Sequence, residues 1–157
     1  MRIIAVGIAE IKVVQPPALL RTNLGSCIAV CIYDPATATG GLLHFMMPRS
    51  LQGTAIVKKA KYADTGIQEL VEEVKRMSQA KSCSGFVAKI FGGARVLQNI
   101  SSDIGSNNEE AARRILKEMG IPITASQTGG DRGYKIEFDV GTGIARCQRF
   151  GEEAKEY

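Results

Sequence analysis

Two stretches of the chain carry apolar residues at helical spacing. Over Tyr62–Lys81 the apolar side chains recur every three or four residues, which predicts an amphipathic helix. The same spacing predicts a second helix over about Asn107–Met119, with Gly120 as its stop. Capping-box patterns occur at Thr65–Gln68 and Ser106–Glu109, near the two predicted helix starts, and the first helix could begin a few residues before its box.

Shorter runs, either apolar or alternating, predict β-strands, because successive side chains of a strand point to opposite faces. The predicted strands are Ile3–Ala9, its continuation Ile11–Val14 after a kink, Leu19–Thr22, Ile28–Tyr33, Gly41–Met47, Phe86–Phe91, Ile121–Gln127, Tyr134–Val140 and Ile144–Phe150. The run Ile28–Tyr33 is also compatible with a short buried helix. We predict a loop over Pro48–Val57 and a frayed end over Glu152–Tyr157.

Two helices among eight or so strands indicate an α+β fold. The strands outnumber what one half-covered sheet needs, so we expect layered mixed β-sheets, with two sheets packed together and the helices outside. A length of 157 residues favours one domain that spans residues 1–157.

Composition and charge narrow the classes of protein. The hydrophobic fraction of 45% and the charged fraction of 23% are typical of a soluble globular chain. No apolar run reaches the roughly 18 residues that a membrane helix needs, so we expect no membrane insertion. The N-terminal residues read as a strand and not as a signal peptide, which favours the cytoplasm. The net charge is +4, but the basic residues are scattered and Trp is absent, so we expect no nucleic-acid partner.

Of the four cysteines, one stands in an unusual position. Cys31, Cys83 and Cys147 lie in or beside apolar runs, as expected of small buried side chains. Cys27 instead follows Gly25 and Ser26 at the boundary of an element. The chain has one histidine and no C-x-x-C pair, so we expect no metal site and no cofactor.

The single histidine, His44, lies seventeen positions after Cys27, across a predicted hairpin. A thiol beside an imidazole is the minimum for cysteine nucleophile chemistry. A simple hairpin would place His44 opposite Val30, roughly 10 Å from Cys27 along the strand. An irregular connection, or Cys27 at a helix start, would close that gap, whereas an inert boundary cysteine is the alternative.

Other groups needed for this chemistry lie nearby in sequence. Gly25 removes a side chain from the approach to the thiol, and the backbone N–H groups around Ser26 could face an oxyanion. A general base also needs a third group that fixes its tautomer. Thr22, Asn23 and Ser26 are the candidates just upstream, and Asp34 and Asp64 are less obvious acidic ones.

Ordered sequence blocks extend this pattern along nearly the whole chain. The blocks are Leu24–Pro35, Gly41–Pro48, Lys61–Thr65, Lys89–Ala94, Ile104 and Gly105 with Asn108, and Thr128–Gly130. Together they resemble the CheD family of chemoreceptor glutamine deamidases.

The resemblance implies a cysteine–histidine–threonine triad. Cys27 would be the nucleophile, His44 the general base and acid, and Thr22 the third member. Some members carry the threonine one residue farther from the cysteine, where this chain has Arg21. Two further departures from the family pattern are Asn107, where members often have Arg, and the segment 127–131.

The resemblance also implies a fold similar to the cysteine hydrolase domain of glutamine-deamidating toxins. The partners it implies are the cytoplasmic helices of methyl-accepting chemotaxis receptors and a CheC-type phosphatase. Two alternatives stay open from the sequence: a non-enzymatic adaptor that binds and stimulates such a phosphatase, and a transglutaminase or esterase that uses the same acyl-enzyme.

Overall fold

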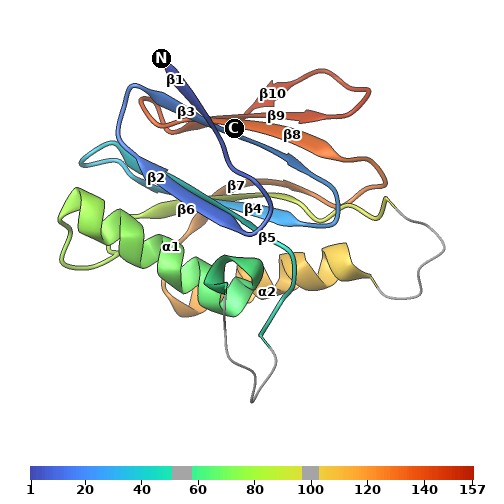
Figure 1. Ribbon diagram of the computed structural model, residues 1–157, viewed down its shortest axis with the longest axis horizontal. Helices are drawn as coiled ribbons and strands as arrows, with labels where there is room; N and C mark the ends of the chain where they lie inside the picture. The colour runs from blue at the N-terminus through green and yellow to red at the C-terminus, as the bar shows by residue number, and fades with distance from the viewer. Residues whose placement is uncertain (51–57, 97–102) are drawn as a thin grey trace.

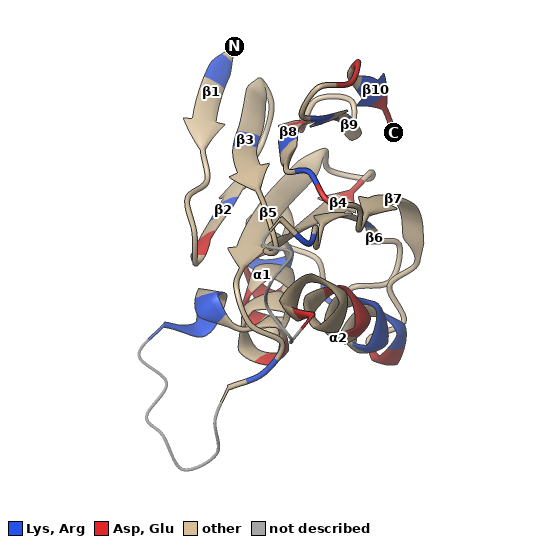
Figure 2. Cartoon of the chain, turned by 90° about the vertical axis from the view of Figure 1, so that its right-hand side faces the viewer, with Lys and Arg blue, Asp and Glu red and all other residues tan. Residues whose placement is uncertain are grey.

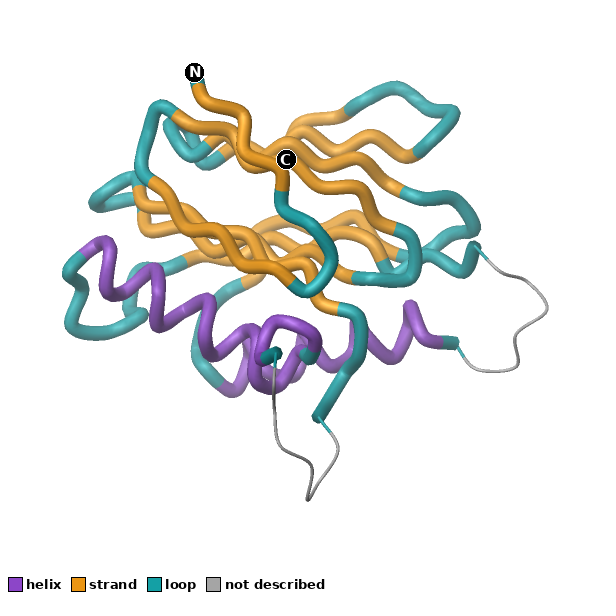
Figure 3. The backbone as a smooth tube through the Cα atoms, in the orientation of Figure 1, coloured by secondary structure: helices purple, strands orange, loops and turns teal. Residues whose placement is uncertain are grey.

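The computed structural model describes residues 1–50, 58–96 and 103–157. Within these residues the chain forms two stacked β-sheets, with helices against the outer face of one of them (Figures 1 and 3). The strands are β1 (Arg2–Ala5), β2 (Glu10–Val14), β3 (Ala18–Leu24), β4 (Ile28–Asp34), β5 (Thr39–Phe45), β6 (Val87–Gly92), β7 (Ile123–Thr128), β8 (Tyr134–Asp139), β9 (Ile144–Arg149) and β10 (Lys155–Glu156). The helices are the 3₁₀ turn η1 (Lys59–Lys61), α1 (Ala63–Ser78) and α2 (Ile104–Glu118).

Both sheets are mixed. One sheet has the order β1-β3-β8-β9-β10, and the other has the order β2-β5-β4-β6-β7. The pairs β1/β3 and β6/β7 are parallel, and the other neighbouring strands are antiparallel. The prediction of an α+β fold with two packed sheets and outer helices is therefore confirmed.

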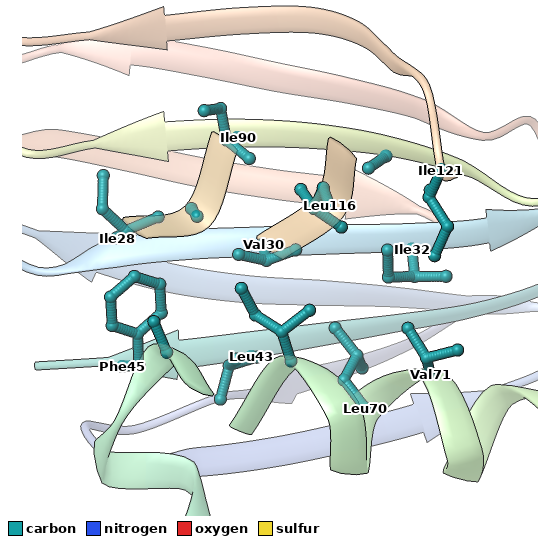
Figure 4. Packing of buried hydrophobic residues seen from close by; sticks show 14 of the residues in the cluster. Ile28, Val30, Ile32, Leu43, Phe45, Leu70, Val71, Ile90, Leu116 and Ile121 are labelled. Atoms are coloured by element: carbon teal, nitrogen blue, oxygen red, sulfur yellow. The ribbon is translucent and has the colours of Figure 1, made fainter. Parts of the chain in front are cut away.

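Strand β4 is buried on both faces and divides the core into two layers. Ile28, Val30 and Ile32 point toward the helices, where they pack with residues of α1 and α2 (Figure 4). Ala29 and Cys31 point the other way and pack against the inner face of the first sheet. A run buried on both faces has no alternation, which explains why its sequence was also compatible with a helix. The structure makes it a strand, so the helical alternative for Cys27 is wrong.

The predicted N-terminal strand is divided between the two sheets. Residues Ile3–Ala9 and Ile11–Val14 were expected to form one kinked strand, but β1 belongs to the first sheet and β2 to the second. The chain crosses from one layer to the other around Ala9, whose φ is 58°. Both runs were predicted correctly to contain strands, but which sheet each strand joins depends on its partners.

Both helices begin earlier than their predicted capping boxes. Helix α1 follows directly after η1, and the Thr65 hydroxyl donates to the Lys59 carbonyl instead of capping the helix. Helix α2 is capped by Asp103, whose carboxylate accepts the Ser106 N–H at 2.9 Å. The predicted cap, Ser106, lies three residues farther on and donates its backbone N–H to Asp103 instead. Gly120 ends α2 with a φ of 72°, as predicted.

The C-terminal residues are ordered, and the prediction of a frayed end is wrong. Strand β10 pairs with β9, and the Tyr157 ring contacts the Phe91 ring edge-on at 5.8 Å. Tyr157 also donates a hydrogen bond from its hydroxyl to Gln127. These contacts connect residues distant in sequence, so no local pattern reveals them.

Charged residues are dispersed over the fold. Figure 2 shows basic and acidic residues on both sheets and on both helices, with the two signs mixed along α2. No helix among the described residues is long and apolar enough to cross a bilayer. Part of the predicted loop Pro48–Val57 lies outside the described residues.

Candidate active site

The imidazole of His44 lies between the two sheets. His44 sits in β5 and pairs with Ala29 of β4 on one side and with Glu10 of β2 on the other. The predicted hairpin register placed it opposite Val30, so the observed pairing is one residue closer to Cys27. A one-residue change of register also moves a side chain to the other face of the sheet. His44 therefore faces the first sheet and not the helices.

A hydrogen-bond chain fixes the orientation of this imidazole. The Thr22 hydroxyl donates to the Val6 carbonyl at 2.7 Å, and its oxygen lies 2.8 Å from His44 Nδ1. Because the hydroxyl has one hydrogen, its oxygen must accept from Nδ1–H. The proton of the neutral imidazole is then on Nδ1, and the lone pair is on Nε2. Nε2 is buried and has no hydrogen-bond partner among the described residues.

The structure explains why Thr22 and not a neighbour approaches His44. Side chains alternate along β3, so Thr22 is buried while Asn23 is exposed. Arg21 also points outward, where its guanidinium bonds Glu137 at 2.7 Å. A threonine at position 21 would share that outward direction. The acidic candidates bind elsewhere: Asp34 accepts from Thr37, and Asp64 accepts from Ser50.

Cys27 lies in the short turn between β3 and β4, at the boundary predicted for it. Its side chain is half-buried and packs against the cluster between the sheets, next to Ala29. Since Ala29 is the direct partner of His44, Cys27 is at a diagonal cross-strand position. Diagonal neighbours have Cα atoms roughly 7–8 Å apart, which brings long side chains within reach. The observed register therefore places His44 one residue closer to Cys27 along the strand than the plain hairpin predicts.

Three consecutive carbonyl groups of this turn are held by donors from other elements. Ala94 N–H donates to the Gly25 carbonyl, and Gly93 N–H donates to the Cys27 carbonyl, both at 2.9 Å. The Ser26 carbonyl accepts from the Asn108 side chain at 3.1 Å. The N–H groups of Ser26 and Cys27 have no acceptor among the described residues. Two unpaired N–H groups beside a thiol form a site that can receive an oxyanion.

Burial keeps both reactive groups uncharged in the resting protein. It lowers the pKa of His44 to about 4, against the opposing effects of the Val6 carbonyl and the Glu10 carboxylate. Burial also raises the pKa of the Cys27 thiol. At neutral pH the pair is therefore a thiol and a neutral imidazole. A neutral imidazole can accept a proton from the thiol. Catalytic hydrogen bonds tighten when substrate binds, so we expect the transfer in the substrate complex.

Sequence reasoning missed two contributors to this site. Asn108 was noted only as part of a family block, and its hydrogen bonds to two distant segments have no sequence signal. Glu10 was not noted, yet it is the cross-strand partner of His44. Gly92 ends β6 and Gly93 follows it, and their φ values are 105° and 68°.

The remaining cysteines and the acidic residues give no second centre. Cys31 and Cys147 are buried, and burial raises their pKa values to about 12 and about 11. Cys83 is half-buried, and its thiol donates to the Met119 carbonyl at 3.7 Å. All four cysteines are free. In the described part of the chain, no group of three or more His, Cys, Asp or Glu residues is placed to hold a metal ion.

Comparisons with known sequences agree on one family. A family model described as "CheD chemotactic sensory transduction" matches residues 46–149. A probable chemoreceptor glutamine deamidase CheD of Desulforamulus reducens is 40% identical over 157 residues, which cover 97% of this chain and 93% of the relative. The chemoreceptor glutamine deamidase CheD of Thermotoga maritima is 39% identical over 147 residues, which cover 93% and 91%. The Desulforamulus reducens relative aligns with 97% of this chain, so that match extends to the segments that precede residue 46.

A solved structure shares the fold at low identity. A Neisseria meningitidis protein of the DUF152 family superposes with a TM-score of 0.50 and 10% identity. The match covers 83% of this chain and 63% of that protein, so this chain spans less than two thirds of its length. Likeness at this level concerns the fold alone.

Proposed function

Because this chain belongs to the CheD family, we propose that it is a chemoreceptor glutamine deamidase that uses Cys27 as its nucleophile and His44 as its base. The enzyme hydrolyses the side-chain amide of specific receptor glutamines to glutamate. The observation that carries the assignment of residues is the bond between Thr22 and His44 Nδ1, which leaves the buried Nε2 without a hydrogen-bond partner among the described residues.

In the first half of the reaction, His44 Nε2 takes the thiol proton as Cys27 Sγ attacks the amide carbonyl carbon. The carbonyl π electrons move to oxygen, and the unpaired N–H groups of Ser26 and Cys27 hold the resulting oxyanion. The tetrahedral intermediate collapses, the C–N bond breaks, and His44 returns its proton to the departing ammonia. A Cys27 thioester remains.

In the second half, His44 Nε2 takes a proton from water, whose oxygen attacks the thioester carbonyl. The C–S bond breaks, the thiol recovers its proton from the imidazolium, and the product is glutamate. Thr22 keeps the Nδ1–H tautomer through both halves. The Glu10 carboxylate favours the imidazolium electrostatically while it carries the transferred proton.

The family also supplies the expected setting. We propose that the substrates are the cytoplasmic helices of methyl-accepting chemotaxis receptors, that the enzyme works in the cytoplasm, and that a CheC-type phosphatase is a second partner. We also propose that residues 1–157 form a single domain. Its fold would be similar to the cysteine hydrolase domain of deamidating toxins.

The first prediction tests the nucleophile. A purified receptor cytoplasmic fragment is incubated with the enzyme, and Gln-to-Glu conversion is mapped by the mass gain at each peptide. We expect Cys27→Ala to lower the rate more than about 1000-fold, because no other group can form the thioester. Cys83→Ala, which removes a half-buried thiol outside the site, should retain the wild-type rate.

The outcomes separate the alternatives. Deamidation that persists in Cys27→Ala would contradict the mechanism. An inactive wild type that still stimulates a CheC-type phosphatase would identify the chain as an adaptor. Cross-linked product in the presence of a primary amine would identify a transglutaminase.

A further inference from the structure

Asn108 connects the two segments that carry the proposed catalytic pair. It lies in α2, and its side chain is fully buried. Its Nδ2 donates to the Ser26 carbonyl at 3.1 Å and to the Met46 carbonyl at 2.9 Å. Ser26 directly precedes Cys27, and Met46 follows His44 by two residues. One side-chain amide thus holds both segments from a third element.

We propose that Asn108 is a positioning residue that holds Cys27 in register with His44 and aims the Cys27 N–H at the oxyanion. The proposal rests on the proposed function, since it concerns the same site. Asn108 does not touch the reacting atoms and acts through the two backbone segments that it joins.

The bonding pattern establishes how the amide is oriented. Both acceptors are carbonyl oxygens, so the nitrogen and not the oxygen of the amide must face them. The nitrogen has two hydrogens, and each supplies one bond. Oδ1 is left buried without a partner among the described residues. A buried acceptor without a donor lowers the stability of the fold. We infer that the two hydrogen bonds donated by Nδ2 outweigh this cost.

The bond to Ser26 also orients the peptide that precedes the nucleophile. In a planar trans peptide the C=O of one residue and the N–H of the next point in opposite directions. The Ser26 carbonyl is drawn toward α2, so the Cys27 N–H points away from α2. That N–H is one of the two donors of the turn that have no acceptor among residues 1–50, 58–96 and 103–157. Asn108 therefore fixes the direction of an oxyanion donor as well as the position of the turn.

The test compares two variants of the same buried helix face. Asn108→Leu keeps a similar volume and removes both donors. Leu116→Ala removes packing from α2, where Leu116 is fully buried in the cluster beside the helices, and its apolar side chain makes no hydrogen bond to either catalytic segment. Rates of receptor-fragment deamidation are measured at a temperature at which circular dichroism shows both variants folded.

We expect Asn108→Leu to lower kcat about 10- to 100-fold with KM changed less than about threefold, since small misplacements of reacting groups have effects of this size. Leu116→Ala should keep kcat near the wild-type value although its thermal unfolding midpoint falls further. A wild-type kcat in Asn108→Leu, or a kcat that follows the unfolding midpoint in both variants, would overturn the proposal. Asn108→Ala replaces the leucine variant if that variant does not fold.

A second readout does not depend on the receptor. The rate of Cys27 alkylation by iodoacetamide is followed against pH, with Cys31 and Cys147 protected by burial and Cys83 replaced by Ala. The Asn108 variant should show its midpoint at higher pH than the wild type, because the thiolate loses an aimed N–H donor and its imidazole. An unchanged midpoint would overturn the positioning role. The two proposals can also fail separately. If the alkylation midpoints of the wild type and the Asn108 variant differ as expected but the wild type deamidates no receptor fragment, the proposed function fails while the role of Asn108 stands.

Discussion

At the scale of single residues, the protein keeps a histidine uncharged by enclosing it. His44 is 2% exposed, and the Thr22 hydroxyl lies 2.8 Å from its Nδ1 and orients the ring. Burial disfavours the imidazolium, which lowers its pKa from 6.5 to about 4. Because its pKa is low, the imidazole is unprotonated at neutral pH and can accept a proton. Its charged form then needs to be stabilised only while the reaction takes place.

The second prediction follows from this pKa. Because the chain has one histidine, a single imidazole NMR signal reports its titration. We expect a midpoint near pH 4 and the proton on Nδ1 above it. A midpoint near 6.5 would show that the imidazole is solvated, contrary to its burial.

The same group makes stability depend on pH. The folded pKa of about 4 lies below the unfolded value of 6.5, so the unfolded state binds more protons between these values. The stabilisation is complete above pH 6.5 and is lost as the pH falls toward 4. From pH 7.5 to pH 4, the unfolding free energy of the wild type should fall by about 3 kcal/mol more than that of His44→Gln. Equal pH slopes in urea unfolding of the two proteins would contradict this expectation.

At the scale of elements, the end of β6 supports the turn that carries the nucleophile. Gly92 has a φ of 105°, and a Cβ placed there would overlap the Cys27 carbonyl oxygen. Gly93 then donates its N–H to that same oxygen. Glycine is required here for close approach as well as for conformation, since L-residues avoid this φ.

The third prediction separates these two requirements. Gly120 also has a positive φ, of 72°, but a Cβ there meets nothing within 4 Å. Both Gly92→Ala and Gly120→Ala should lose about 1–2 kcal/mol of unfolding free energy from backbone strain. Gly92→Ala alone should also lose deamidase activity, because its Cβ must displace the Cys27 carbonyl. Equal activities of the two variants would show that the turn does not depend on this contact.

At the scale of the whole molecule, the candidate site exists because two sheets are stacked. Thr22 comes from the first sheet and His44 from the second, and their hydrogen bond crosses the interface. Lys89 of β6 also crosses it, where its Nζ donates to the Gly143 and Tyr157 carbonyls at 2.7 Å each. The stacking that buries the apolar cluster between the sheets thus also assembles the chemistry.

The fourth prediction concerns the stacking alone. Lys89→Met keeps the aliphatic chain but removes the side-chain donor to the Gly143 carbonyl and one of two donors to the Tyr157 oxygen, which should lower the unfolding free energy by about 1–3 kcal/mol. Deamidation at 25 °C should be unchanged, since Lys89 is not part of the site. The matched control is Lys155→Met at an exposed position of β10, which should change neither quantity. A stability of Lys89→Met equal to that of Lys155→Met would show that the cross-sheet bonds contribute nothing.

Local patterns in the sequence were enough to predict most of the elements and the reactive residue types. Alternation in β8 and helical spacing in α1 and α2 follow from which side chains must be buried. A cysteine after Gly25 and Ser26, with one histidine across a hairpin, indicated the chemistry before any fold was known. Thr22 followed from the family resemblance together with its place among the upstream candidates.

Tertiary structure alone decided how these residues meet. The pairing of His44 with Ala29, the separation of β1 from β2, the bonds of Asn108 and the ordered Tyr157 all depend on contacts between distant segments. Local sequence encodes which face of an element is apolar, because burial of that face is a property of the element itself. It does not encode register or the choice of partner strand, because these depend on how whole sheets pack.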